Sequence, residues 1–81
     1  MWKEENNSLN RTFKFTDFKE AFGFMTEIAF YAEKANHHPN WSNVYNTVEI
    51  SLKTHDAGNI VTDKDRNLAA DIDKVFAKYS T

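Results

Sequence analysis

The chain has no cysteine, a single proline and only two glycines among its 81 residues. Without cysteine it can form neither disulfides nor a thiolate metal site, and nothing in it points to an oxidising compartment. It has no apolar run near the roughly 20 residues that span a bilayer, and its polar N-terminus is unlike a signal or transit peptide. These absences predict a soluble, cytoplasmic protein for which a membrane is not a partner.

A basic patch is also missing. Ten Lys and Arg and twelve Asp and Glu are mixed along the chain, giving a formal net charge of −2. Because a phosphate backbone is held by clustered Lys and Arg, we do not expect nucleic acid to be a partner. A sheet that binds single-stranded RNA stacks bases on exposed aromatics. The exposed face expected for residues 44–54 offers only Tyr45 among polar and charged neighbours.

Apolar and aromatic residues are plentiful. Hydrophobic residues make up 41% of the chain, with seven Phe, two Trp and three Tyr, which excludes a disordered protein. Residues 1–81 are therefore predicted to form one domain, which at this size buries only about 60% of the surface that its unfolded chain exposes. Small domains without disulfides often gain further burial by self-association, so we expect a homo-oligomer.

The first elements are predicted to be a β-hairpin. Apolar and polar residues alternate over residues 8–15, which indicates a half-buried strand with Arg11 as its irregular position. Residues 2–6 are a weaker strand candidate, and residues 6–8 have the composition of a turn between the two.

A long helix is predicted next. Asp17 and Glu20 have the spacing of a capping box at its start, and it must end before Pro39. Its apolar residues recur at spacings of three and four and are expected to form the buried stripe: Phe18, Ala21, Phe22, Met25, Ile28, Ala29 and Ala32. Phe24 lies on the shoulder of this stripe and is assigned to the core with Phe22 and Met25. Phe30 projects to the opposite side of the helix. With Tyr31 beside it, Phe30 is a candidate subunit contact.

The second half predicts a strand, a short returning strand and a final helix. Residues 44–54 alternate most clearly, residues 60–61 offer the returning strand, and Thr62 and Asp65 have capping-box spacing. The apolar stripe of the last helix is Leu68, Ile72, Val75, Phe76 and Tyr79. The element order is β-β-α-β-β-α. We predict an α+β fold with a four-stranded antiparallel sheet and helices packed on one face.

The three histidines are the candidate chemical groups. His37 and His38 follow the long helix and His55 follows a strand, so all three are expected in loops. Imidazole donates and accepts protons near neutral pH. The spacing leaves two alternatives open: the three histidines share one site, or they are incidental surface residues. In a shared site, Pro39 and Trp41 would offer a flat apolar wall to a planar ligand.

Other readings of the polar residues are less favoured. Three histidines can bind zinc, but the chain has no H-x-x-x-H pair and no cysteine, so no metal site is expected. Asp63 and Asp65 are interpreted as helix-capping groups rather than catalytic carboxylates.

The most specific pattern is E-K-x-x-H-H-P-x-W-x-x-V-Y, formed by Glu33, Lys34, His37, His38, Pro39, Trp41, Val44 and Tyr45. The pair Thr54-His55 follows it. In these residues, and over almost the whole length from Trp2 to about Tyr79, the chain resembles the pterin-4a-carbinolamine dehydratases. Its three histidines fall on the three active-site histidines of that family.

The resemblance implies a dehydratase, a lyase that removes water from 4a-hydroxytetrahydropterin to give quinonoid dihydropterin in tetrahydropterin recycling. It also implies a functional link to an aromatic amino acid hydroxylase, which releases this substrate. Pterin is the substrate, and no cofactor or metal is expected. His37 and His55 are expected to act as acid and base, and His38 to hold the pterin. Pro39 and Trp41 are expected to shape the substrate-binding pocket.

Glu33 and Thr54 complete the substrate-binding residues that the resemblance implies, with Glu33 orienting an imidazole. Two departures from the family stand out. We expect the fold to lack the extra N-terminal helix of many relatives, and Asn40 stands where a glutamate is common in the family. The family also implies a homodimer joined through sheet edges, or a homotetramer joined through helices. The alternative function is a non-catalytic dimerisation or transcriptional cofactor module on the same fold. The intact histidines favour catalysis.

Overall fold

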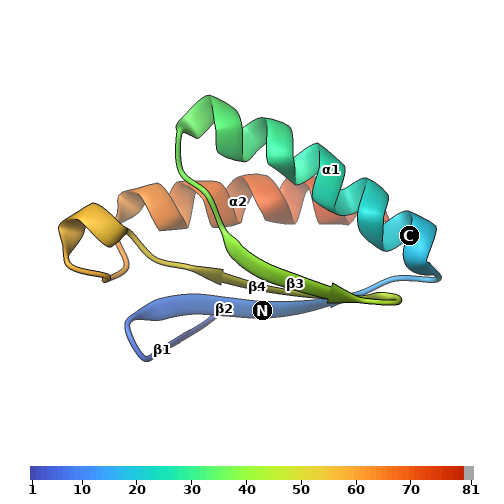
Figure 1. Cartoon of the computed structure of the whole chain (residues 1–81), viewed down its shortest axis with the longest axis horizontal. Coiled ribbons are helices and arrows are strands. Elements are labelled where there is room, and N and C mark those ends of the chain that lie inside the picture. The colour runs from blue at the N-terminus through green and yellow to red at the C-terminus, as the bar shows by residue number, and fades with distance from the viewer. Residues whose placement is uncertain (80–81) are drawn as a thin grey trace.

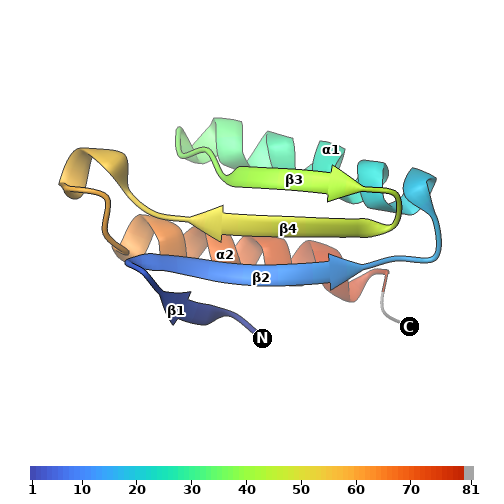
Figure 2. The same ribbon diagram turned by 60° about the horizontal axis from the view of Figure 1, so that its bottom comes forward.

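A computed structural model describes residues 1–79 and shows one antiparallel sheet with both long helices on the same face (Figure 1). Its elements are β1 (Lys3–Glu5), β2 (Ser8–Lys14), α1 (Phe18–Ala35), β3 (Asn40–Val44), β4 (Thr47–Leu52), the short 3-10 helix η1 (His55–Ala57) and α2 (Asp63–Ala77). The strand order is β1-β2-β4-β3, as seen from the open face in Figure 2. The predicted fold class and the β-β-α-β-β-α order are confirmed. No helix within residues 1–79 is both long enough and apolar enough to cross a membrane.

The core lies between the sheet and the two helices. Leu9 and Phe13 of β2 face the helices, as the alternation predicted, and both are buried. Arg11 shares their face because its guanidinium lies over two rings, 4.5 Å from the centroid of Phe13 and 5.3 Å from that of Phe76. The same guanidinium donates to a carboxylate oxygen of Asp73 at 2.8 Å. A cation paired with an acid and stacked on aromatics can occupy a position otherwise reserved for apolar residues.

The third and fourth strands lie elsewhere than predicted. The strand expected over residues 44–54 is in fact the turn and second half of a hairpin, since β3 ends at Val44 and β4 begins at Thr47. The amide of Asn43 holds this turn by donating to the carbonyl oxygens of Tyr45 and Thr47. Val44 is consequently exposed rather than buried.

The returning strand expected at residues 60–61 is also wrong. Ile60 makes a single antiparallel bridge with Thr54, and no strand is built around it. This bridge closes a short loop that contains η1, which carries His55 away from the end of β4.

Helix α1 begins as predicted, with a side-chain oxygen of Asp17 accepting from the N–H of Glu20 at 2.9 Å. Its buried face differs from the predicted stripe and consists of Ala21, Phe24, Ile28 and Ala32. Phe18 and Phe22, assigned to the stripe, are 51% and 54% exposed. The face is rotated toward Phe24 because that ring packs against aromatic rings of both β2 and α2, within 6.0 Å of the ring centroid of Phe76.

Helix α2 begins as predicted, although Tyr79 of its predicted stripe lies beyond the last helical residue, Ala77. Thr62 and Asp65 form the expected capping box, and the buried apolar residues of the helix include Leu68, Ile72 and Val75. Figures 1 and 2 show the end of α1, the helix η1 and the start of α2 at the same end of the molecule. The fold therefore brings together three segments that carry the histidines and the capping box.

Candidate active site

The end of α1 sets the positions of the paired histidines. Asn36 adopts a left-handed conformation with a φ of 51° and stops the helix. The N–H of His37 then donates to the carbonyl of Ala32 at 3.0 Å, and the N–H of Asn36 donates to that of Glu33 at 3.1 Å. This pair of bonds is the Schellman arrangement, which turns the chain sharply after a helix.

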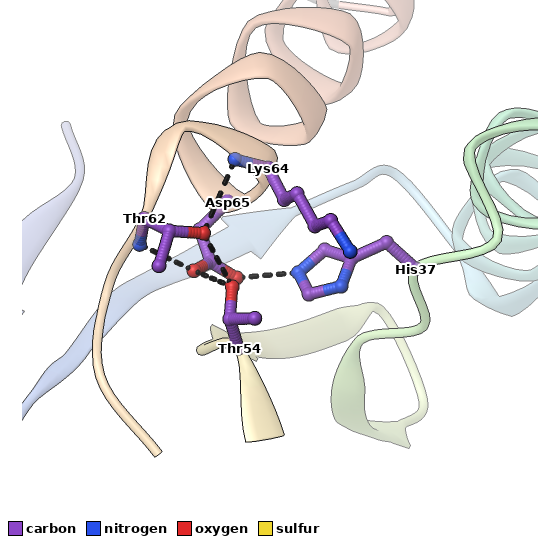
Figure 3. Close-up of polar contacts among 5 residues, drawn as sticks. All are labelled: His37, Thr54, Thr62, Lys64 and Asp65. Carbon is purple, nitrogen blue, oxygen red and sulfur yellow. Dashed lines mark hydrogen bonds and ion pairs between the residues drawn. The ribbon is translucent and has the colours of Figure 1, made fainter. Parts of the chain in front are cut away.

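His37 is held against the start of α2 by a buried carboxylate. Its Nε2 lies 2.5 Å from Oδ1 of Asp65, whose side chain is fully buried. The other oxygen of Asp65 accepts from the hydroxyl of Thr54 at 2.8 Å and from the N–H of Thr62 at 2.9 Å. Figure 3 shows the imidazole and the two threonines converging on this carboxylate. The carboxylate thus joins the start of α2 to the segments that follow α1 and β4.

The same contacts determine the charge of Asp65. Burial by itself raises the pKa of this carboxyl, but the hydrogen bonds from His37, Thr62 and Thr54 together lower it below its ordinary value of 3.8. Asp65 is therefore ionised at neutral pH and can only accept, so Nε2 of His37 carries the proton in their hydrogen bond. A neutral His37 consequently has its lone pair on Nδ1.

The other two histidines lie at the surface. Nε2 of His38 is 3.2 Å from a carboxylate oxygen of Glu33, and both side chains are largely exposed. His55 begins η1, and its Nδ1 lies 2.9 Å from Oδ1 of Asn59. Each of these contacts uses one ring nitrogen. Within residues 1–79 the second ring nitrogen of each of the three histidines has no protein hydrogen-bond partner.

These histidines line one hollow. It has a volume of about 220 Å³ and is bounded by Asn36, His37, His38, Lys53, Thr54, His55, Asp56 and Lys64. The structure thus places His55 with the pair, which the spacing left open. A neutral imidazole can accept a proton and a charged one can donate it. Three imidazoles around one hollow can therefore supply both an acid and a base to one small molecule.

Of the remaining predicted site residues, the structure brings one to the hollow. Thr54 lines the hollow, but its hydroxyl is engaged with Asp65 and Thr62. Trp41 packs partly against the core and borders a different hollow of about 330 Å³ on the sheet. Pro39 and Glu33 do not line the histidine hollow. In the part of the chain that the structure describes, no three His, Asp or Glu side chains are grouped so as to hold a metal ion.

Comparison with known proteins gives the family of the chain. Residues 1–75 match the family model described as pterin 4 alpha carbinolamine dehydratase. The chain belongs to this family. In Rhodopseudomonas palustris a relative named "Putative pterin-4-alpha-carbinolamine dehydratase" is 52% identical over 80 residues, covering 96% of this chain and 78% of the relative. In Prochlorococcus marinus a protein of the same name is 53% identical over 77 residues, covering 95% and 79%.

Two solved structures share the fold of this family member. A transcriptional coactivator/pterin dehydratase from Brucella melitensis superimposes with a TM-score of 0.87 at 43% identity, covering 91% of this chain and 80% of the other. A pterin dehydratase-like protein described as a RuBisCO assembly factor in the alpha-carboxysome has a TM-score of 0.73 at 22% identity, covering 93% and 86%. At 22% identity, the second similarity supports a shared fold and nothing further.

Asp65 is the site residue that the sequence did not reveal as such. Its spacing from Thr62 identified it only as a cap, and its bond to His37 spans 28 positions of the chain. No local pattern signals such a contact, because it depends on where the end of α1 meets the start of α2.

Proposed function

We propose that this dehydratase-family protein catalyses the loss of water from 4a-hydroxytetrahydropterin, giving quinonoid dihydropterin in tetrahydropterin recycling. The observation that carries the proposal is the hollow in which the three histidines of the family pattern meet, one of them anchored by a buried carboxylate. Family membership names the reaction, and the hollow supplies groups suited to it.

The chemistry needs one proton delivered and one removed. An imidazolium protonates the 4a hydroxyl, the C4a–O bond breaks as water leaves with the bonding electrons, and a neutral imidazole takes the proton from N5 of the ring. We assign the acid and base roles to His37 and His55, and the holding of the pterin to His38. No cofactor takes part in these steps.

The surrounding residues act through the histidines in this proposal. Glu33 orients His38 through the contact between its carboxylate and Nε2. Thr54 orients His37 indirectly by donating to Asp65. Pro39 directly follows His38 and Trp41 lies three residues beyond it in β3, and in this proposal both hold the backbone that carries His38.

The test is the rate at which 4a-hydroxytetrahydropterin decays, followed by ultraviolet absorbance while a hydroxylase generates it. Wild-type protein should accelerate the decay. Removal of a working acid or base is expected to lower the rate by about 10²- to 10⁴-fold. The decay rates with His37→Ala and His55→Ala should therefore be lower by this factor, whereas His38→Ala should mainly raise KM. Tyr45→Ala, an exposed aromatic in the β3–β4 turn, is the control that should match wild type. Near-wild-type rates in all three histidine variants would refute the assignment.

A non-catalytic protein-binding role is the second candidate. It is favoured by the exposed rings of Phe18 and Phe22 on α1, whose centroids are 5.7 Å apart, and by the coactivator description of the Brucella melitensis relative. A well-folded protein that leaves the decay rate unchanged would support this role over catalysis.

A further inference from the structure

Two lysines stand at the rim of the histidine hollow. Lys53 directly follows β4 and Lys64 lies in the first turn of α2, so they reach the hollow from different elements. Both residues are exposed. In Figure 3 the side chain of Lys64 extends from the start of α2 toward the imidazole of His37. The three imidazoles and these two lysines therefore border the same space.

The charges around the hollow do not balance. Asp56 is the one acidic residue among those that line it, against Lys53 and Lys64. Asp65 does not line the hollow, and its oxygens accept hydrogen bonds from His37, Thr54 and Thr62. Within residues 1–79 neither ammonium group has an ion-pair partner. Counted over the residues that line it, the rim therefore carries one net positive charge when all three imidazoles are neutral, and the charge of the buried Asp65 is held against His37.

This excess opposes the proposed reaction on a neutral substrate. When the protonated hydroxyl leaves as water, the pterin ring carries a positive charge until N5 loses its proton. The positive charges of the two rim lysines disfavour such an intermediate. A negative group on the substrate itself would offset them in the same complex.

We propose that Lys53 and Lys64 bind an anionic group on the side chain of the pterin. The substrate class is then a 4a-hydroxytetrahydropterin whose side chain ends in a phosphate ester or a carboxylate, rather than a neutral polyol. Ammonium groups on flexible stems suit an anion that lies outside the planar ring and at a variable distance from it. This inference rests on the dehydratase activity proposed above and names its substrate.

The test compares three substrates that share the ring: a neutral dihydroxypropyl side chain, its phosphate ester, and a glutamyl-type carboxylate. Wild-type kcat/KM should be about tenfold higher for at least one anionic form at low ionic strength and should converge with the neutral form as salt screens the charges. Lys53→Gln and Lys64→Gln should each lower kcat/KM for the anionic substrates by about 3- to 10-fold. This is the range for one partly exposed charge pair. The phosphate and carboxylate arms show which anion the site takes.

Lys19→Gln is the matched control, because Lys19 is an exposed lysine of α1 outside the hollow. The control should keep the wild-type preference. The Lys53→Gln/Lys64→Gln double variant should lose that preference because its kcat/KM for the anionic substrates falls, whereas its kcat/KM for the neutral substrate should not fall, since the removed charges oppose that reaction. Equal rates on the three substrates, or a preference that survives in the double variant, would overturn the inference and leave the dehydratase proposal standing. No acceleration of any substrate by folded wild-type protein would overturn both.

Discussion

At the scale of single residues, Asp65 serves two purposes that the sequence shows only in part. It caps α2 through the N–H of Thr62 and anchors His37 through the same carboxylate. The first purpose was predicted from a spacing of three residues, because helix caps are local. The second was missed because the partner comes from the far end of another helix. The carboxylate is the group whose loss should disturb both stability and site geometry.

Substitution Asp65→Asn is expected to lower the free energy of unfolding at neutral pH by about 2–4 kcal/mol, because it removes a buried, charge-assisted set of hydrogen bonds. The pKa of Asp65 is lower in the folded state than its ordinary value of 3.8. Its ionisation therefore stabilises the fold fully above that value and progressively less as the pH falls through the folded-state pKa. Urea unfolding should show that the difference in free energy of unfolding between wild type and Asp65→Asn narrows as the pH falls below 3.8. A difference in free energy of unfolding that does not change with pH would mean that the charge of Asp65 contributes nothing to stability.

At the scale of secondary-structure elements, a turn without glycine or proline explains why one strand prediction is wrong. The alternation through residues 44–54 was interpreted as one strand because the two-residue turn in it contains no glycine or proline. Tyr45 adopts a φ of 51° there, which is unusual for a bulky residue, and the amide of Asn43 supports it. The buried face of α1 was misplaced for a different reason. Apolar residues cover both flanks of that helix, so periodicity alone could not choose its centre.

The end of α1 allows a direct test of how the paired histidines are placed. Asn36 has a φ of 51°, a conformation that costs most residues about 1–2 kcal/mol and costs asparagine and glycine less. Asn36→Ala should therefore lower the free energy of unfolding by about 1 kcal/mol, whereas Asn36→Gly should stay close to wild type. Chemical denaturation of the three proteins measures both values. An alanine variant as stable as the glycine variant would show that the left-handed turn is not required.

At the scale of the whole molecule, the element order was enough to predict the fold class, because β-β-α-β-β-α hairpins and helices pack in few ways. The meeting of the three histidines could not be predicted from spacing. It depends on β4 and α1 ending at the same edge of the molecule, which Figures 1 and 2 show. The family resemblance pointed to the same three residues.

Self-association remains a prediction at this scale. Phe18, Phe22 and Phe30 are each more than half exposed on α1, and β3 is an edge strand of the sheet. Exposed rings on a small domain favour contact with a second copy. Sedimentation velocity should show wild type heavier than one chain and Phe18→Lys/Phe22→Lys shifted toward the monomer, with Lys14→Glu on the open sheet face as an unaffected control. A wild type that sediments as a single chain at micromolar concentration would contradict the expectation.

The central claim is that His37 and His55 act together on one bound pterin. It is tested most directly by kcat/KM for 4a-hydroxytetrahydropterin dehydration in wild type, His37→Ala, His55→Ala and the double variant. Groups that work as a unit are not additive, so the account predicts that the double variant is about as slow as the slower single variant. A double variant that still dehydrates the pterin at nearly the wild-type rate would contradict it.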